Sequence, residues 1–190
     1  MEHKLIEDKI FEKGNFTKNQ LLEGDYELCK FINCDFSEAS LSLINFVECE
    51  FVICNLSLAR FDETALRDVK FKDCKLLGLH FENCAEFGLS FSFENCTLDH
   101  SSFYKRKINK TVFKNSQLHE TDFTECDLTG SIFDNCDLER AVFINTIIEK
   151  ADFRTSYNYT IDPEINKIKK AKFSRDGLAG LLNKYDIKVE

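Results

Sequence analysis

Nine cysteines and four histidines are the residues of this 190-residue chain with the widest chemical range. Cys29 and Cys34, and again Cys49 and Cys54, lie five positions apart, which is close enough to consider a zinc site. Zinc needs four ligands that converge on one point. The histidines are scattered and have no nucleophile or carboxylate in an arrangement typical of catalysis. Whether the thiols converge depends on the elements that position them.

Those elements follow a five-residue period. From Phe11 to Phe81 every fifth residue is Phe, Leu or Tyr, and after a shift of two residues the period resumes from Phe93 to Phe153. Sixteen of the 19 phenylalanines lie on these two series. A repeat this regular indicates a stacked architecture rather than an ordinary globular core.

A period of five fits neither an α-helix nor a flat strand. On a helix, steps of five residues spread the apolar side chains around the whole cylinder. On a strand, an odd step sends them to alternate faces. We therefore predict an all-β coil in which each five-residue segment forms one side with its central residue inward. Successive coils would stack at the inter-strand spacing of about 4.8 Å.

A second periodic set lies two residues before each central residue. It is mostly small, and it contains all nine cysteines, as a narrow interior at normal packing density requires. Successive cysteines then fall on different sides of a coil, so we predict no metal site and no cofactor. Even where stacking brings two thiols within the span of a disulfide, we expect reduced, packed thiols. Arg106 occupies one of these small-residue positions with a long side chain, so we predict a local departure from the ideal coil there.

Composition limits the class of function. A net charge of −8 argues against direct binding to nucleic acid or an anionic membrane. No apolar run approaches the length of a membrane span, and residues 1–8 lack the apolar stretch of a signal peptide. We expect a cytoplasmic protein. A filled interior leaves no substrate cleft, and the segment 177–180 lacks the lysine of a phosphate loop, so we predict no enzymatic activity.

Individual units resemble a known family. The segments Cys34–Glu38, Cys126–Gly130, Cys136–Arg140 and Ala151–Thr155 are similar to the A-(D/N)-(L/F)-x-x motif of pentapeptide-repeat proteins. This resemblance implies a right-handed, four-sided parallel β-helix of about seven coils. We assign residues 1–156 to it and residues 157–190 to a C-terminal cap.

The register break lies between residues 82 and 92, where the frame carries two extra residues. A bulge or small kink between two halves of the solenoid is the favoured interpretation. The alternative is a short protruding loop that contacts a partner.

The C-terminal segment is expected to cover the open end of the solenoid. Ser174 is predicted to begin a short helix, followed by a strand-like alternation. The segment Asp162–Ile168 resembles the tail through which microcin-immunity relatives dimerise. The resemblance therefore implies a homodimer. Its predicted interface consists of Leu178, Leu181, Leu182, Tyr185, Ile187 and Val189.

The acidic residues mark a predicted partner-binding surface. They are densest in a segment without a single base, at Glu120, Asp122, Glu125, Asp127, Asp134, Asp137 and Glu139. Stacking also places Glu48 next to Asp68, and Asp62 next to Glu82. Like charges opposed across strands are mildly destabilising, which suggests a surface potential kept for a partner.

Stacking predicts compensated pairs as well. Lys30, Glu50 and Lys70 should form one ladder. Glu120 should pair with Arg140, and Asp134 with Arg154. A basic segment from Lys105 to Lys114 interrupts the acidic surface.

Within the family, this sequence resembles the quinolone-resistance and microcin-immunity members, which are acidic rods that look like DNA. The resemblance implies a type II topoisomerase (DNA gyrase or topoisomerase IV) as partner, protected from a quinolone or a peptide toxin. The competing hypothesis is a rigid scaffold or adaptor for another protein. A continuous acidic stripe would favour mimicry, whereas acids interrupted by the bases of residues 105–114 would favour the adaptor.

Overall fold

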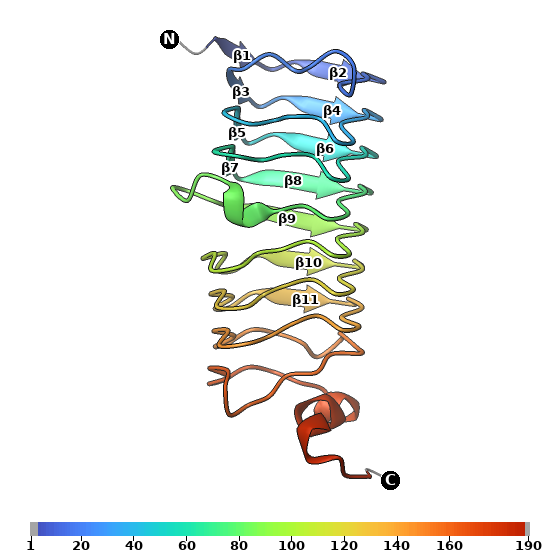
Figure 1. The fold of residues 1–190 in the computed structure, drawn as a ribbon, viewed down its shortest axis with the longest axis vertical. Coiled ribbons are helices and arrows are strands. Elements are labelled where there is room, and N and C mark those ends of the chain that lie inside the picture. The colour runs from blue at the N-terminus through green and yellow to red at the C-terminus, as the bar shows by residue number, and fades with distance from the viewer. Residues whose placement is uncertain (1–3, 189–190) are drawn as a thin grey trace.

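The computed structural model describes residues 4–188, which form a rod of stacked coils (Figure 1). Its strands are short because each occupies one side of a coil. They are β1 (Leu5–Glu7), β2 (Ile10–Glu12), β3 (Asp25–Glu27), β4 (Lys30–Ile32), β5 (Asn45–Val47), β6 (Glu50–Val52), β7 (Ala65–Arg67), β8 (Val69–Lys72), β9 (Phe91–Glu94), β10 (Val112–Lys114) and β11 (Ile132–Asp134).

The strands form two parallel sheets on adjacent sides of the rod. One has the order β1-β3-β5-β7, and the other is seven-stranded with the order β11-β10-β9-β8-β6-β4-β2. Residues twenty positions apart pair in register, as Phe31 pairs with Phe51. Across the break the step grows by two, because Phe71 pairs with Phe93. The predicted all-β parallel solenoid is confirmed.

Aromatic rings form the centre of the rod. On the side that carries β2, the ring centroids of Phe93 and Phe113 lie 5.2 Å apart and those of Phe113 and Phe133 lie 4.7 Å apart, nearly parallel in both cases. The Phe113 ring also meets the Phe123 ring edge-on, with their centroids 6.0 Å apart. Stacked and edge-to-face pairs each add stabilisation beyond burial, so the five-residue period is also an aromatic ladder.

The cysteines line the interior beside these rings. All nine are free and buried, which confirms the prediction of packed thiols. The Cys49 thiol donates to the carbonyl oxygen of Tyr26 across 3.2 Å, and the Cys54 thiol to that of Phe31 across 3.3 Å. Within residues 4–188, no three His, Cys, Asp or Glu side chains gather as they would around a metal ion.

The coil turns at residues with left-handed backbone conformation. Asn95, Asn115 and Asn135 occupy three stacked corners with φ of 54°, 48° and 51°, a region that asparagine tolerates well. Their amides hydrogen-bond along the rod, with Asn115 donating to Asn95 at 3.2 Å and Asn135 donating to Asn115 at 2.9 Å. These corners therefore add a polar ladder outside the aromatic one.

The register break forms a loop rather than a bulge. After the short helix η1 (Phe81–Asn83), residues 84–90 form a loop whose exposed part, residues 86–88, stands out from the side of the rod (Figure 1). Phe87 at the loop is 82% exposed. Its ring centroid lies 5.5 Å from the guanidinium carbon of Arg67, and Ser90 donates to Asp68 at 3.1 Å. The structure therefore shows the protruding loop of the alternative interpretation, and its contact with a partner stays a prediction.

Arg106 lies at the same break. Its guanidinium group donates to the carbonyl oxygen of Glu82, one coil earlier in the rod. The local departure predicted for Arg106 is therefore connected with the extra residues, because its long side chain reaches back toward the start of the loop.

The solenoid extends beyond residue 156, where we predicted its end. Lys167 bridges to Ile147 and Lys172 to Asp152, and the ring of Phe173 stacks 5.5 Å from that of Phe153. The pentapeptide motif fades here, but the coil persists because its inter-coil hydrogen bonds use backbone groups, which every residue except proline supplies in full.

Two short 3₁₀ helices, η2 (Asp176–Leu181) and η3 (Asn183–Tyr185), cover the C-terminal end. The predicted short helix is present but begins at Asp176, with Arg175 rather than Ser174 as its N-cap residue. The hydroxyl of Ser174 accepts from the Gly177 amide at 3.0 Å. The predicted strand is wrong for residues 186–188, which have no regular structure. Val189 lies outside the described residues. No helix in the described part of the chain could span a bilayer.

Candidate protein-binding surface

The acidic segment from Glu120 to Glu139 surrounds the rod instead of lying on one side. Twenty residues complete a coil, as the pairing of Asp122 with Val142 shows. Asp127 therefore lies on the side that continues the β1 sheet, and Asp134 lies in β11 on the adjacent side. The sequence cluster does not form an acidic face.

Several of these acids are neutralised by the neighbouring coil. Glu120 lies 3.2 Å from Arg140 and 3.4 Å from His100. Glu125 lies 3.6 Å from Lys105. Their charges are paired along the rod axis, which lowers the potential that they present to a partner.

The remaining acids mostly accept hydrogen bonds. Asp122 accepts from the Thr124 amide at 2.8 Å, and Asp127 accepts from the Thr129 amide at 3.0 Å. Such bonds are typical of Asx turns, so these aspartates shape the coil. Asp134 accepts from the Thr155 hydroxyl at 3.0 Å.

Asp137 lies beside a histidine. Its carboxylate lies 3.0 Å from Nε2 of His119, whose Nδ1 lies 3.6 Å from Asp99. Partial burial opposes ionisation of Asp137, but hydrogen bonds from Asn158 and His119 hold its pKa below the ordinary value. The hydrogen bond to Asp137 raises the pKa of His119. Glu139 lies 3.9 Å from Nε of Arg140.

The two like-charge pairs have different environments. Asp62 accepts from the side-chain amide of Asn83 at 3.1 Å, and Glu82 lies 2.8 Å from Nδ1 of His80. Each acid of this pair therefore has a polar neighbour. Glu48 and Asp68 are both exposed. Neither forms an ion pair with another residue in the range 4–188.

The predicted charge ladders are confirmed in two cases of three. Glu50 lies 3.2 Å from Lys30 and 3.3 Å from Lys70, and Glu120 pairs with Arg140 as described above. The third prediction, of Asp134 with Arg154, is wrong. Arg154 instead lies 2.8 Å from Asp152, two residues away on the same side of the coil, because that carboxylate is nearer.

Bases thus alternate with acids over much of the rod. In the basic segment, Lys105 pairs with Glu125, and Lys114 pairs with Glu94 at 2.9 Å. By the criterion given above, an interrupted acidic surface favours the adaptor over close mimicry of DNA.

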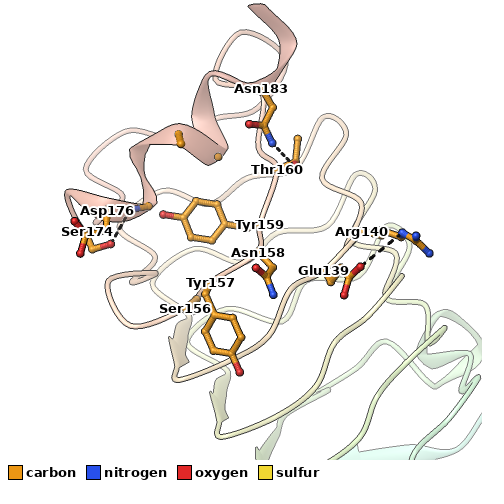
Figure 2. A pocket seen from close by; sticks show the side chains of 13 residues that line it. Glu139, Arg140, Ser156, Tyr157, Asn158, Tyr159, Thr160, Ser174, Asp176 and Asn183 are labelled. Atoms are coloured by element: carbon orange, nitrogen blue, oxygen red, sulfur yellow. Dashed lines mark hydrogen bonds and ion pairs between the residues drawn. The ribbon is translucent and has the colours of Figure 1, made fainter. Parts of the chain in front are cut away.

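A cavity of about 820 Å³ lies between the last coil and the cap (Figure 2). Glu139 and Arg140 form one wall, and Ser174 and Asn183 belong to the cap. Tyr159 is buried between the last coil and the cap. Its hydroxyl has no hydrogen-bond partner among the described residues. Sequence reasoning missed Tyr159, since it lies outside the regular five-residue series.

Two glycines let the cap approach Tyr159. A Cβ atom at Gly177 would collide with the Tyr159 hydroxyl, and one at Gly180 would collide with the Tyr159 carbonyl oxygen. The Gly180 carbonyl accepts from the Ile161 amide at 3.0 Å. These close approaches hold the cap against the last coil.

Gly180→Ala is therefore expected to lower the free energy of unfolding by about 1–3 kcal/mol, because backbone must shift to admit the methyl group. Hydrogen exchange at the Ile161 amide should accelerate, since that amide loses its acceptor when the cap withdraws. Ala179→Ser, at an exposed neighbour, is the control and should change neither quantity. Wild-type exchange at Ile161 in Gly180→Ala would contradict the proposed packing.

The predicted dimer residues are divided between surface and core. Leu178, Tyr185 and Ile187 are exposed by 47%, 51% and 56%. Leu181 packs against the core, and Leu182 is partly buried. The exposed three leave the tail available to a partner, and dimerisation through it stays a prediction.

Stacked coils, inward aromatic columns and left-handed corners define a parallel β-solenoid. The family model for the pentapeptide repeat region matches residues 25–91 and 89–157. The chain belongs to the pentapeptide-repeat family. None of the curated proteins matches its sequence.

Solved structures share the fold. Two trypsin-treated forms of QnrB1, a plasmid-mediated fluoroquinolone resistance protein, align with TM-scores of 0.58 and 0.59. The first is 17% identical and covers 98% of this chain and 100% of its own. The second is 18% identical and covers 97% and 99%. At these identities the similarity establishes a common fold.

Proposed function

We propose that this protein is a non-catalytic, cytoplasmic binding protein that engages a type II topoisomerase and protects it from a quinolone or a peptide toxin. The observation that carries the proposal is the alignment of nearly the whole rod with a fluoroquinolone resistance protein over nearly its whole length. A shared fold alone does not determine function, so support must also come from the surface.

The loop at the register break is the best-formed contact point on that surface. Aromatic side chains dominate the energetics of protein interfaces, and Phe87 is an exposed aromatic residue on a raised loop. Arg67 beneath its ring and Ser90 bonded to Asp68 hold the loop in place. A positioned loop of this kind loses little conformational freedom on binding.

The test is supercoiling by purified DNA gyrase with and without a fluoroquinolone, as this protein is titrated. We expect rescue of the drug-inhibited enzyme at low protein concentration. Phe87→Ala should reduce the rescue at least tenfold in required concentration without changing stability. Leu22→Ala, which truncates a residue that is 70% exposed elsewhere on the rod, is the matched control. Absence of any effect from folded wild-type protein would exclude protection of gyrase.

A scaffold that binds another protein is the second candidate, and the ion-pair ladders favour it. Paired charges such as Lys30, Glu50 and Lys70 rigidify the rod while lowering its net field. If neither gyrase nor topoisomerase IV responds while Phe87→Ala still weakens capture of a cellular protein, the adaptor function is the one that remains.

A further inference from the structure

One side of the rod carries charges that do not pair within the chain. We call it the β1 face: the side formed by β1, β3, β5 and β7 and continued by the segments centred on Ile108, Leu128, Ile148 and Ile168. Asp25 of β3 is left out of this comparison. None of the other acidic or basic side chains of the β1 face forms an ion pair with another residue of the range 4–188. The ladders described above lie on the other sides.

The charges of this face are separated by sign. The coils before the break carry Glu7, Asp8, Glu27, Glu48 and Asp68. Glu7 and Glu27 are direct partners in the register of β1 and β3, and like charges so placed are destabilising. The two bases of this half are Lys4, which directly precedes β1, and Arg67, which lies against the Phe87 ring. This half of the face is acidic.

The coils after the break carry the opposite charge. Their exposed bases are Lys107, Lys110, Lys150, Lys167, Lys169 and Lys170. Two acids accompany them: Asp127 is hydrogen-bonded to Thr129, and Glu149 is half-buried. Lys150 and Lys170 occupy stacked corners, since the Lys150 amide donates to the Lys169 carbonyl oxygen at 3.0 Å. This half of the face is basic.

We propose that the β1 face binds the same face of a second copy of this chain in an antiparallel dimer. Four side segments precede the break and four follow it, so a two-fold axis at the break opposes each acidic half to a basic half. In a two-fold interface each patch meets its complement twice. Glu7 and Asp8 of one copy then face Lys169 and Lys170 of the other, and Asp68 faces Lys107 and Lys110.

The loop at residues 84–90 lies at the centre of this arrangement. It overlies the β1 face, because Phe87 contacts Arg67 and Ser90 bonds Asp68 of the preceding coil. The two-fold dimer covers Phe87, so the contact with a topoisomerase proposed above would be made by the free chain. An apolar centre surrounded by charged residues has the anatomy of a specific interface. The dimer is distinct from a tail-to-tail dimer through Leu178, Tyr185 and Ile187.

The experiment is sedimentation equilibrium of the full chain at 50 mM and 500 mM NaCl. We expect a dimer at low salt whose dissociation constant rises at least tenfold at high salt, because screening weakens the opposed charges. The acid-reversed variant, Glu7→Lys with Asp8→Lys, and the base-reversed variant, Lys169→Glu with Lys170→Glu, should each weaken self-association at least tenfold.

Mixing the two variants is the decisive arm. One then carries bases at both ends of the β1 face and the other carries acids at both ends, so an antiparallel heterodimer regains both contacts. We expect the mixture to dimerise at least tenfold more tightly than either variant alone. Glu12→Lys with Glu38→Lys makes the same charge change outside the β1 face and should leave the dimer intact.

Three outcomes would overturn the proposal. They are a wild-type monomer at low salt, reversed variants that dimerise as well as wild type, and failure of the mixture to associate although both variants show native circular dichroism. If Leu178→Asp with Ile187→Asp abolishes the dimer and the charge reversals do not, the tail is the interface and the β1 face is not.

Discussion

Phe113→Ala is expected to lower the free energy of unfolding by about 3–5 kcal/mol. The Phe113 side chain is fully buried. It stacks on Phe93 and Phe133 and meets Phe103 and Phe123 edge-on. Alanine would leave a cavity that the coils cannot close, because their spacing is fixed by backbone hydrogen bonds on both sides.

Urea unfolding followed by circular dichroism measures this effect. Phe113→Leu is the matched control, since leucine already fills inward positions such as Leu118 and Leu128. The volume mismatch of Phe113→Leu should lower the free energy of unfolding by less than about 1.5 kcal/mol. The loss of ring stacking lowers it further. Because the ladder transmits stability between neighbouring coils, we also expect Phe113→Ala to broaden the transition. A loss below about 1 kcal/mol for the alanine variant would contradict the ladder.

Alkaline pH is expected to destabilise the protein strongly, beginning near pH 9. Burial raises the pKa of Cys49 and of Cys136 to about 12, and burial likewise raises the pKa of Tyr26 to about 12. An unfolded thiol ionises near pH 8.5. The contribution of these protonated groups to the free energy of unfolding is therefore fully present below that pH. It is lost as the pH rises toward 12, because in this range only the unfolded chain releases these protons. Each such thiol contributes about 1.4 kcal/mol per pH unit to the loss.

The measurement is the free energy of unfolding in urea at pH 8, 9 and 10 with a reductant present. Cys49→Ser with Cys136→Ser is the matched variant, because Ser131 and Ser116 already occupy equivalent small inward positions and hydrogen-bond to carbonyl oxygens. Its alkaline slope should be shallower by about 3 kcal/mol per pH unit. Equal slopes for the variant and wild type would show that these thiols ionise in the folded protein.

The candidate surface was less predictable than the fold, and the reason is the range of the forces involved. The pair of Glu120 with Arg140 follows from the coil period alone, since both occupy equivalent corners one coil apart. The pair of Arg154 with Asp152 does not, because a long flexible side chain chooses among carboxylates by local distance. The acids of residues 120–139 are neighbours in the sequence, but one coil distributes them over all its sides. The segment is therefore not a patch on the surface.

The sequence by itself determined the period, the inward positions of the aromatic and thiol side chains, and hence the stacked all-β coil. Every five-residue segment must place a large apolar side chain and a small one inside the coil, so each segment shows the same pattern in the sequence. Only the tertiary structure decided three features: the extension of the coil to Lys172, the raised loop that presents Phe87, and the separation of unpaired charge along the β1 face. Each depends on where coils far apart in sequence place their backbone and side chains, and no local pattern encodes that placement.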